Sequence, residues 1–111
     1  MMRTNKNFVI FLLFNFFQIQ PSWSFNLETG KKLFNDNCIA CHNQGTNVII
    51  PEKNLQKSIL ERDGMYTMDA IIYQVLNGKN GMPAFGGRLK EEDINQVATY
   101  ILDQSEKNFE K

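Results

Sequence analysis

The chain has few of the residues that build disulfide frameworks or metal clusters. Its 111 residues include two cysteines and one histidine. Cys38 and Cys41 are three positions apart, so a bridge between them would close too small a loop to constrain the unfolded chain. A zinc site needs four ligands, and the two cysteines with His42 supply only three. Neither a stabilising disulfide nor a structural zinc site is therefore expected.

The sequence also lacks an excess of positive charge. It contains 12 Lys and Arg residues and 12 Asp and Glu residues. Arg3 and Lys6 fall within the first 24 residues, which contain no acidic residue, so the rest of the chain is slightly acidic. Nucleic-acid binding requires a strongly basic face. We therefore expect no nucleic-acid partner.

No apolar run is long enough for a transmembrane helix. The run at residues 8–17 is interrupted once by asparagine, whereas a membrane span needs about 20 apolar residues. Two basic residues precede this run, and Ser22 and Ser24 follow it at spacing suited to cleavage, as in a secretory signal. We predict a cleaved signal peptide over residues 1–24, one domain over residues 25–111, and no stable membrane insertion after cleavage.

Apolar residues recur at helical spacing in four segments, and no segment shows the alternation of a strand. These segments predict helices at about residues 27–37, 55–60, 68–77 and 90–105, and hence an all-α domain. The third helix has Thr67 as a candidate N-cap and Gly78 as a stop signal. Its apolar stripe comprises Met68, Ile71, Ile72, Val75 and Leu76. The stripe of the last helix comprises Ile94, Val97, Ala98, Ile101 and Leu102.

The segment Cys38-Ile39-Ala40-Cys41-His42 is the pattern that carries chemistry. Two thiols at this spacing can add to the two vinyl groups of a haem, and the histidine that follows can bind its iron. This is the attachment pattern of haem c. A thioredoxin-like redox pair uses the same cysteine spacing but requires strands alternating with helices. We predict one haem c per chain, covalently bound to Cys38 and Cys41, with His42 as an axial ligand.

The second axial ligand cannot be histidine, so methionine is the candidate. Met68 falls on a predicted buried stripe, and Met65 lies in a short turn. Met82 lies between Gly81, which lets the backbone approach the haem, and Pro83, which stiffens the loop. We predict that Met82 is the second ligand. Iron with both axial positions filled suits electron transfer rather than the binding of gas or peroxide.

Metal-bound histidine usually donates its second ring N–H to a carbonyl group or a carboxylate. The carbonyl of Pro51, nine residues after His42, is the predicted acceptor for that N–H.

The sequence resembles the class I cytochromes c, and closely the cytochromes c6 of algae and cyanobacteria. The resemblance rests on Gly30 with Phe34, on the haem attachment pattern, and above all on residues 77–89, Asn-Gly-Lys-Asn-Gly-Met-Pro-Ala-Phe-Gly-Gly-Arg-Leu. It implies the class I fold, with about four helices packed around one haem. It also implies that the first and last helices cross, with Gly30 and Phe34 against Tyr100.

The same resemblance implies a soluble one-electron carrier rather than an enzyme. The carrier would act in the thylakoid lumen, and we expect it to be a monomer. The first 24 residues lack a long Ser- and Arg-rich transit region, which suits a plastid-encoded or cyanobacterial gene, and the abundance of residues with A/T-rich codons favours an algal plastid. The alternative is the thylakoid lumen or periplasm of a cyanobacterium. The carrier's electron donor would be cytochrome f of the cytochrome b6f complex, and its acceptor photosystem I.

The resemblance also implies that Gln74 lies near the haem and that Arg88 contacts a partner. From the residues alone, Gln74 would be a solvated helix residue and Arg88 a surface charge. A respiratory cytochrome c that serves a terminal oxidase is the nearest alternative function. A haem peroxidase or gas-binding domain is a further alternative, which Met82 as a ligand would disfavour.

Overall fold

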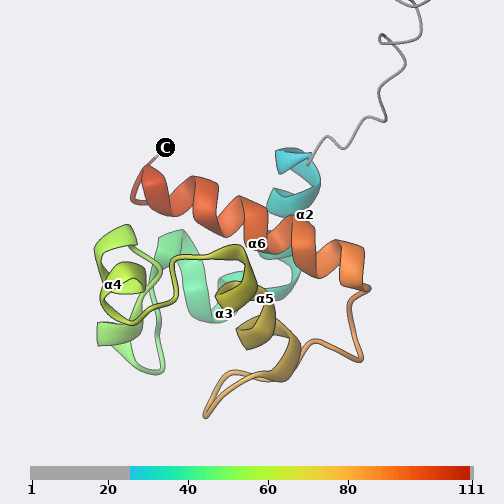
Figure 1. Cartoon of the computed structure of the whole chain (residues 1–111), viewed down its shortest axis with the longest axis horizontal. Helices are drawn as coiled ribbons and strands as arrows, with labels where there is room; N and C mark the ends of the chain where they lie inside the picture. Colours follow the sequence, from blue (N-terminus) through green and yellow to red (C-terminus); the bar gives the residue numbers. More distant parts are fainter. Residues whose placement is uncertain (1–25, 111) are drawn as a thin grey trace, which may run out of the picture.

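The computed structural model describes residues 26–110, and the regular secondary structure of this range is helical apart from one isolated β-bridge. Figure 1 shows α6 lying across the molecule, with α4 and α5 on the opposite side from the start of α2. The helices are α2 (Leu27–Asn37), α3 (Ile39–His42), α4 (Lys57–Arg62), α5 (Met68–Asn77) and α6 (Glu91–Glu106), with 3-10 turns at Asn43–Gly45 and Pro51–Lys53. The predicted all-α fold is confirmed.

Two sequence-based predictions concern the membrane. The signal peptide predicted over residues 1–24 lies outside the described residues and stays a prediction. Within residues 26–110, no helix has the length and apolar character that crossing a bilayer requires.

Side-chain caps fix where α2 and α5 begin. The side-chain oxygen of Asn26 accepts the N–H of Glu28 at 3.0 Å, and the hydroxyl of Thr67 accepts the N–H of Ala70 at 3.1 Å. Such caps satisfy backbone donors that the first helical turn leaves free. Gly78 ends α5 with a φ of 70°, a region that favours glycine. The predicted bounds of both helices are confirmed.

The helices α2 and α6 cross at a glycine. A Cβ on Gly30 would lie 2.5 Å from the carbonyl oxygen of Gln96 and 2.8 Å from Cβ of Tyr100. One turn later, the buried ring of Phe34 lies 5.4 Å from the ring of Tyr100, centroid to centroid. The crossing that the resemblance implies is confirmed. It explains why α2 contains a residue that costs about 1 kcal/mol in helix propensity relative to alanine.

The other two predicted helices are displaced along the sequence. The prediction placed the start of α4 at Leu55, but the side chain of Asn54 accepts the N–H of Gln56 at 3.0 Å. This bond forms a turn ahead of the helix, which therefore begins at Lys57. The last helix is displaced by one residue, because Lys90 is its N-cap rather than its first residue.

The apolar stripe predicted for α5 is too wide. Ile71 and Val75 are buried, whereas Leu76 is 42% exposed. The chain after α5 folds back along it, so that the N–H of Phe85 donates to the carbonyl of Val75 at 2.9 Å, and the N–H of Gly86 to that of Leu76 at 3.1 Å. Phe85 from this returning segment is buried in the core. Leu76 consequently stays on the outside.

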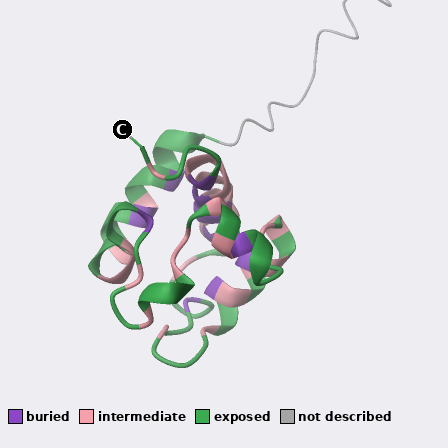
Figure 2. Cartoon of the chain, turned by 90° about the vertical axis from the view of Figure 1, so that its left-hand side faces the viewer, coloured by how far each residue is buried: buried purple, intermediate pink, exposed green. Residues whose placement is uncertain are grey.

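Buried residues, coloured purple in Figure 2, alternate along the helices with half-buried and exposed ones. Four of the five apolar positions predicted for α6 are buried, and the fifth, Leu102, is half-buried. The buried apolar core of the described chain comprises Phe34, Leu60, Ile71, Val75, Phe85, Ile94, Val97, Ala98 and Ile101.

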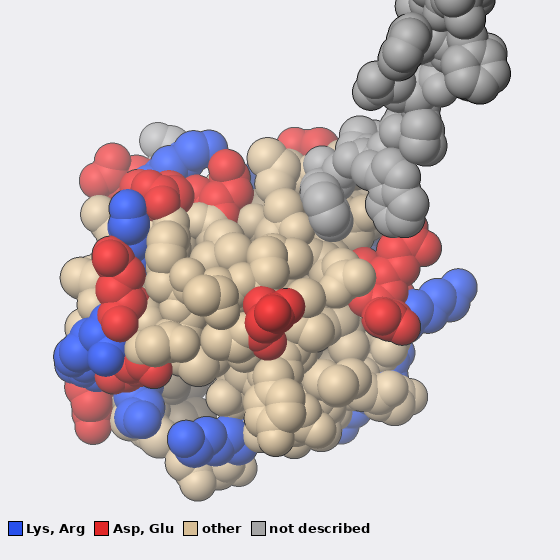
Figure 3. Space-filling view, in the orientation of Figure 1, with Lys and Arg blue, Asp and Glu red and all other residues tan. Residues whose placement is uncertain are grey.

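One face of the described chain carries mostly uncharged side chains at its centre, with Lys, Arg, Asp and Glu mainly around its rim (Figure 3). The helix α5 lies toward this face. Its residues Tyr73 and Leu76 are 70% and 42% exposed, and the loop residues Val48 and Ile49 are each 58% exposed. The molecule therefore leaves several large apolar side chains in contact with solvent.

Candidate haem site

A cavity of about 270 Å³ is lined by side chains from all five α-helices and the loops between them. Its wall includes the core residues Phe34, Leu60, Ile71, Val75, Phe85 and Ile101. Five of the six residues predicted for the site also line it: Cys38, Cys41, His42, Gln74 and Met82. The fold therefore brings the Cys38–His42 segment and the loop that carries Met82 to one apolar cavity.

The two cysteines and the histidine lie on a short helical turn that continues from α2. The N–H of Cys38 donates to the carbonyl of Phe34 at 2.8 Å. The carbonyl of Cys38 in turn accepts the N–H of Cys41 at 3.2 Å and that of His42 at 2.9 Å. Both thiols are free and half-buried. The turn thus presents two thiols and an imidazole along one part of the cavity wall.

The imidazole of His42 is oriented by a backbone carbonyl. Its Nδ1 lies 2.8 Å from the carbonyl oxygen of Thr46. The prediction that Pro51 supplies this acceptor is wrong, because Gln44 and Gly45 adopt positive φ values of 54° and 79° and reverse the chain directly after His42. Since a carbonyl can only accept, Nδ1 carries the proton, and Nε2 is the ring nitrogen left for an iron atom.

A two-residue hairpin holds Met82. The N–H of Lys79 donates to the carbonyl of Met82 at 3.0 Å, and the N–H of Met82 donates to the carbonyl of Lys79 at 2.9 Å. Asn80 at the tip has a φ of 53°. At Gly81, a Cβ would lie 3.1 Å from a side-chain carbon of Ile49. The backbone around Met82 is therefore fixed by its own hydrogen bonds, and the side chain is half-buried in the cavity wall.

The other two methionines of the described chain lie differently. The hydroxyl oxygen of Thr99, which donates to the carbonyl of Asn95, lies 3.7 Å from the sulfur of Met68. This contact places Met68 between α5 and α6, and Met68 does not line the cavity. Met65 lines the cavity, and its N–H donates to the carbonyl of Leu60 at 2.7 Å in the turn after α4. The interpretation of Met68 as a core residue agrees with this placement.

Gln74 is in contact with the sulfur of Met82. Its side-chain Nε2 lies 3.6 Å from Sδ of Met82, within the range of a hydrogen bond to sulfur. Gln74 is half-buried and lines the cavity. The residues alone would have left Gln74 in solvent, whereas the resemblance placed it at the site, where the structure has it.

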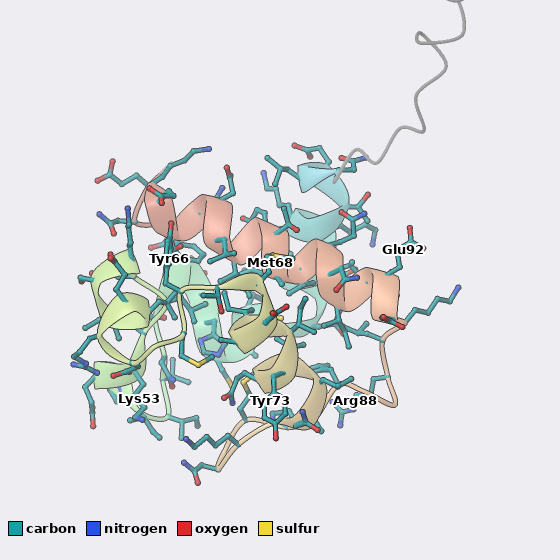
Figure 4. The ribbon with its side chains drawn as sticks, in the orientation of Figure 1. Lys53, Tyr66, Met68, Tyr73, Arg88 and Glu92 are labelled. Carbon is teal, nitrogen blue, oxygen red and sulfur yellow. The ribbon has the colours of Figure 1, made fainter. Side chains whose placement is uncertain are left out.

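Arg88 does not line the cavity. Its guanidinium carbon lies 5.4 Å from the centroid of the Phe85 ring, and Phe85 forms part of the cavity wall. In Figure 4, Arg88 lies on the other side of the view from Lys53, which also lines the cavity. Arg88 is thus an exposed charge that one aromatic ring separates from the site.

The residues at the cavity fit a haem. Two thiols could supply attachment points, and an imidazole and a thioether could supply ligands to its iron. The described residues contain no group of three or more His, Cys, Asp and Glu side chains that could hold a metal ion directly. Burial raises the pKa of the Cys38 thiol to about 11, with Cys41 adding to the increase, whereas the reactive thiol of a thioredoxin-like pair has a lowered pKa. That alternative also lacks its strands, since residues 26–110 contain one isolated bridge.

Two lysines at the cavity were not predicted. Lys53 and Lys79 line it together with Asp63. A hydrogen bond from Arg62, helped by the charges of Lys53 and Lys79, lowers the pKa of the Asp63 carboxyl. Isolated charged residues in loops give no sequence signal for a site. Ammonium groups at a cavity can pair with carboxylate groups of a ligand.

The chain is similar to known proteins over most of its length. The family described as cytochrome C oxidase, cbb3-type, subunit III matches residues 25–101. Cytochrome c6 of Pyropia yezoensis is 53% identical over 104 residues, which cover 91% of this chain and 94% of that protein. Cytochrome c6 of a Synechococcus species is 54% identical over 89 residues, which cover 80% of each. The solved cytochrome c6 of the diatom Phaeodactylum tricornutum is 49% identical with a TM-score of 0.73, and the match covers 75% of this chain and 98% of that one.

Proposed function

Because this chain belongs to the cytochrome c6 family, we propose that it is a one-electron carrier with one covalently bound haem c, and not an enzyme. The observation that carries this proposal is the presence of Cys38, Cys41, His42 and Met82 in the wall of one apolar cavity. When bound, a haem supplies one-electron redox chemistry at its iron. Cys38, Cys41, His42 and Met82 would hold the group, and the apolar side chains of the cavity wall would limit its contact with water.

The roles of the four residues differ. Cys38 and Cys41 would hold the group through thioether bonds. Nε2 of His42 and Sδ of Met82 would both ligate the iron, which would leave no ligand site for oxygen or peroxide. This closed ligation favours an electron carrier over a haem peroxidase or a gas-binding domain.

The exposed apolar side chains support a docking role for one face. Tyr73, Leu76 and Ile49 are exposed near the cavity, and Ile49 also lines it. An electron carrier must release its partner quickly, so a small interface with apolar contact and charge steering suits it. We assign the partners as cytochrome f of the cytochrome b6f complex and photosystem I, in the thylakoid lumen, with Arg88 contributing to steering and with the carrier acting as a monomer.

The test uses the haem-loaded protein with isolated cytochrome f and with photosystem I particles. We expect reduced cytochrome f to reduce the carrier, and a flash to cause its oxidation by photosystem I. Arg88→Ala should slow at least one of these reactions at low salt and leave the reduction potential unchanged. Lys31→Ala, which removes an exposed charge on α2, is the matched control.

A respiratory carrier is the second candidate function, favoured by the match to a family described as an oxidase subunit. If a terminal oxidase preparation oxidises the carrier and photosystem I does not, the photosynthetic assignment is wrong. Absence of a covalent haem in protein matured with a haem c attachment system would contradict both candidates.

A further inference from the structure

The turn that follows α6 has an unusual backbone. After α6, the N–H of Asn108 donates to the carbonyl of Ser105 at 3.0 Å. The N–H of Phe109 donates to the carbonyl of Gln104 at 2.8 Å. This pair of bonds is the Schellman motif that ends many helices, with Asn108 in its left-handed position at a φ of 50°. Phe109 also has a positive φ, 57°, which the motif does not require.

A bulky residue with positive φ costs free energy and persists only where its surroundings compensate. The ring of Phe109 makes two contacts that do so. It lies 6.0 Å from the ring of Phe34, centroid to centroid. It also lies directly against Gly45, where a Cβ would be 2.4 Å from a ring carbon. The strained backbone of Phe109 therefore places an aromatic ring on the backbone of Gly45.

Gly45 belongs to the turn that follows the candidate axial histidine. Its carbonyl accepts the N–H of Leu55 at 2.8 Å. The next carbonyl along the chain, that of Thr46, accepts the Nδ1–H of His42 at 2.8 Å. The ring of Phe109 thus packs on the turn that supplies the acceptor for His42.

We propose that Phe109 is a positioning residue for His42: its ring fixes the turn at Gly45, and with it the Thr46 carbonyl that orients the imidazole. This inference rests on the proposed function, because it requires His42 to bind haem iron. A carbonyl that accepts from Nδ1–H makes an imidazole a stronger electron donor. A stronger donor stabilises ferric iron and lowers the reduction potential, so loosening the turn raises that potential.

The experiment compares Phe109→Ala and Phe109→Trp in the haem-loaded full chain. We expect the alanine variant to have a higher reduction potential and faster amide exchange at Thr46 and Leu55. The tryptophan variant keeps an aromatic ring and should retain the original potential and exchange rates. Phe109→Leu keeps an apolar side chain and gives a smaller increase in potential, which preserves the test if the alanine variant does not fold.

A control separates positioning from a general loss of stability. Ile94→Ala removes a buried side chain about 18 Å along α6 from its last residue, and Ile94 does not line the cavity. We expect this variant to be less stable with an unchanged reduction potential. An unchanged potential in Phe109→Ala, or an equal increase in Ile94→Ala, overturns the inference. Failure of the unaltered chain to bind haem would contradict the proposed function instead. In that case, comparing amide exchange at Thr46 between the unaltered chain and Phe109→Ala would still test whether the Phe109 ring fixes the turn.

Discussion

The side-chain amide of Gln74 donates to the sulfur of Met82 across 3.6 Å. One residue comes from α5 and the other from the hairpin that follows it, and both line the same cavity. An N–H group near a thioether places a partial positive charge beside the sulfur and withdraws its electron density. If Met82 binds iron, this contact weakens electron donation to the metal and favours ferrous iron.

The variant Gln74→Leu should therefore have a lower reduction potential. A hydrogen bond worth about 0.5–1.5 kcal/mol corresponds to a shift of roughly 20–65 mV in a one-electron couple. Redox titration of the haem-loaded protein measures the shift. Gln56→Leu, which changes an exposed glutamine outside the cavity wall, is the control and should leave the potential unchanged. An increase in the Gln74 variant would contradict this role.

Removal of the Met82 thioether should have a larger effect. Met82→Ala opens one axial position and removes a ligand that raises the reduction potential, so the potential should fall by more than in the Gln74 variant. The ligand-field spectrum should change at the same time. Met68→Leu should change neither quantity, because Met68 packs outside the cavity wall. If Met82→Ala has the spectrum and the reduction potential of the unaltered protein, Met82 is not an iron ligand.

The crossing of α2 and α6 predicts a stability defect at one glycine. Gly30→Ala places a Cβ 2.5 Å from the carbonyl oxygen of Gln96, and overpacking of this kind costs typically about 1–3 kcal/mol of unfolding free energy. Urea unfolding of the haem-loaded protein measures the loss. Gly87→Ala has no heavy atom within 4 Å of the added Cβ and should be close to neutral. Equal stabilities of the two variants would show that the crossing tolerates a side chain.

The carboxylate of Glu106 should make stability depend on pH. Hydrogen bonds from the Tyr66 hydroxyl and from the Lys57 ammonium, which lies 3.2 Å away, lower the pKa of Glu106 from its usual 4.5. The ionised form is thus favoured in the folded protein, and its stabilising effect is complete above pH 4.5 and is lost as the pH falls through the lowered pKa. Glu106→Gln should be less stable than the unaltered chain at neutral pH. The difference in unfolding free energy should shrink below pH 4.5, and a difference independent of pH would contradict the account.

Local patterns were sufficient for the parts of the fold that depend on local interactions. The capping side chains of Asn26 and Thr67 and the stop at Gly78 lie within a few residues of the helix ends that they set, and the predicted bounds of α2 and α5 agree with the structure. The exposure of Leu76 could not be predicted in this way. It depends on Phe85 returning along α5 from a loop, which is a tertiary contact.

In the candidate site too, local features were predictable from the sequence and long-range contacts were not. Cys38, Cys41, His42 and Met82 were identified from spacing and from the residues beside them. The carbonyl that accepts from His42 was predicted wrongly, as Pro51 instead of Thr46. Every residue has a carbonyl, so the sequence does not mark the acceptor, and the backbone angles at Gln44 and Gly45 decide which carbonyl faces the imidazole. The contact of Phe109 with Gly45 joins residues 64 positions apart, and no pattern within the sequence marks it.

The packing of α2 on α6 also constrains the order in which this protein can fold. Gly30 and Phe34 meet partners near the other end of the sequence, at Gln96, Tyr100 and Phe109. A chain synthesised from its N-terminus therefore carries α2 without the helix on which it packs until α6 has been made. Such contacts give a helical protein a higher contact order than a bundle whose neighbours are adjacent in sequence, and higher contact order slows folding. A chain truncated before Gln96 has no surface on which the first described helix can pack.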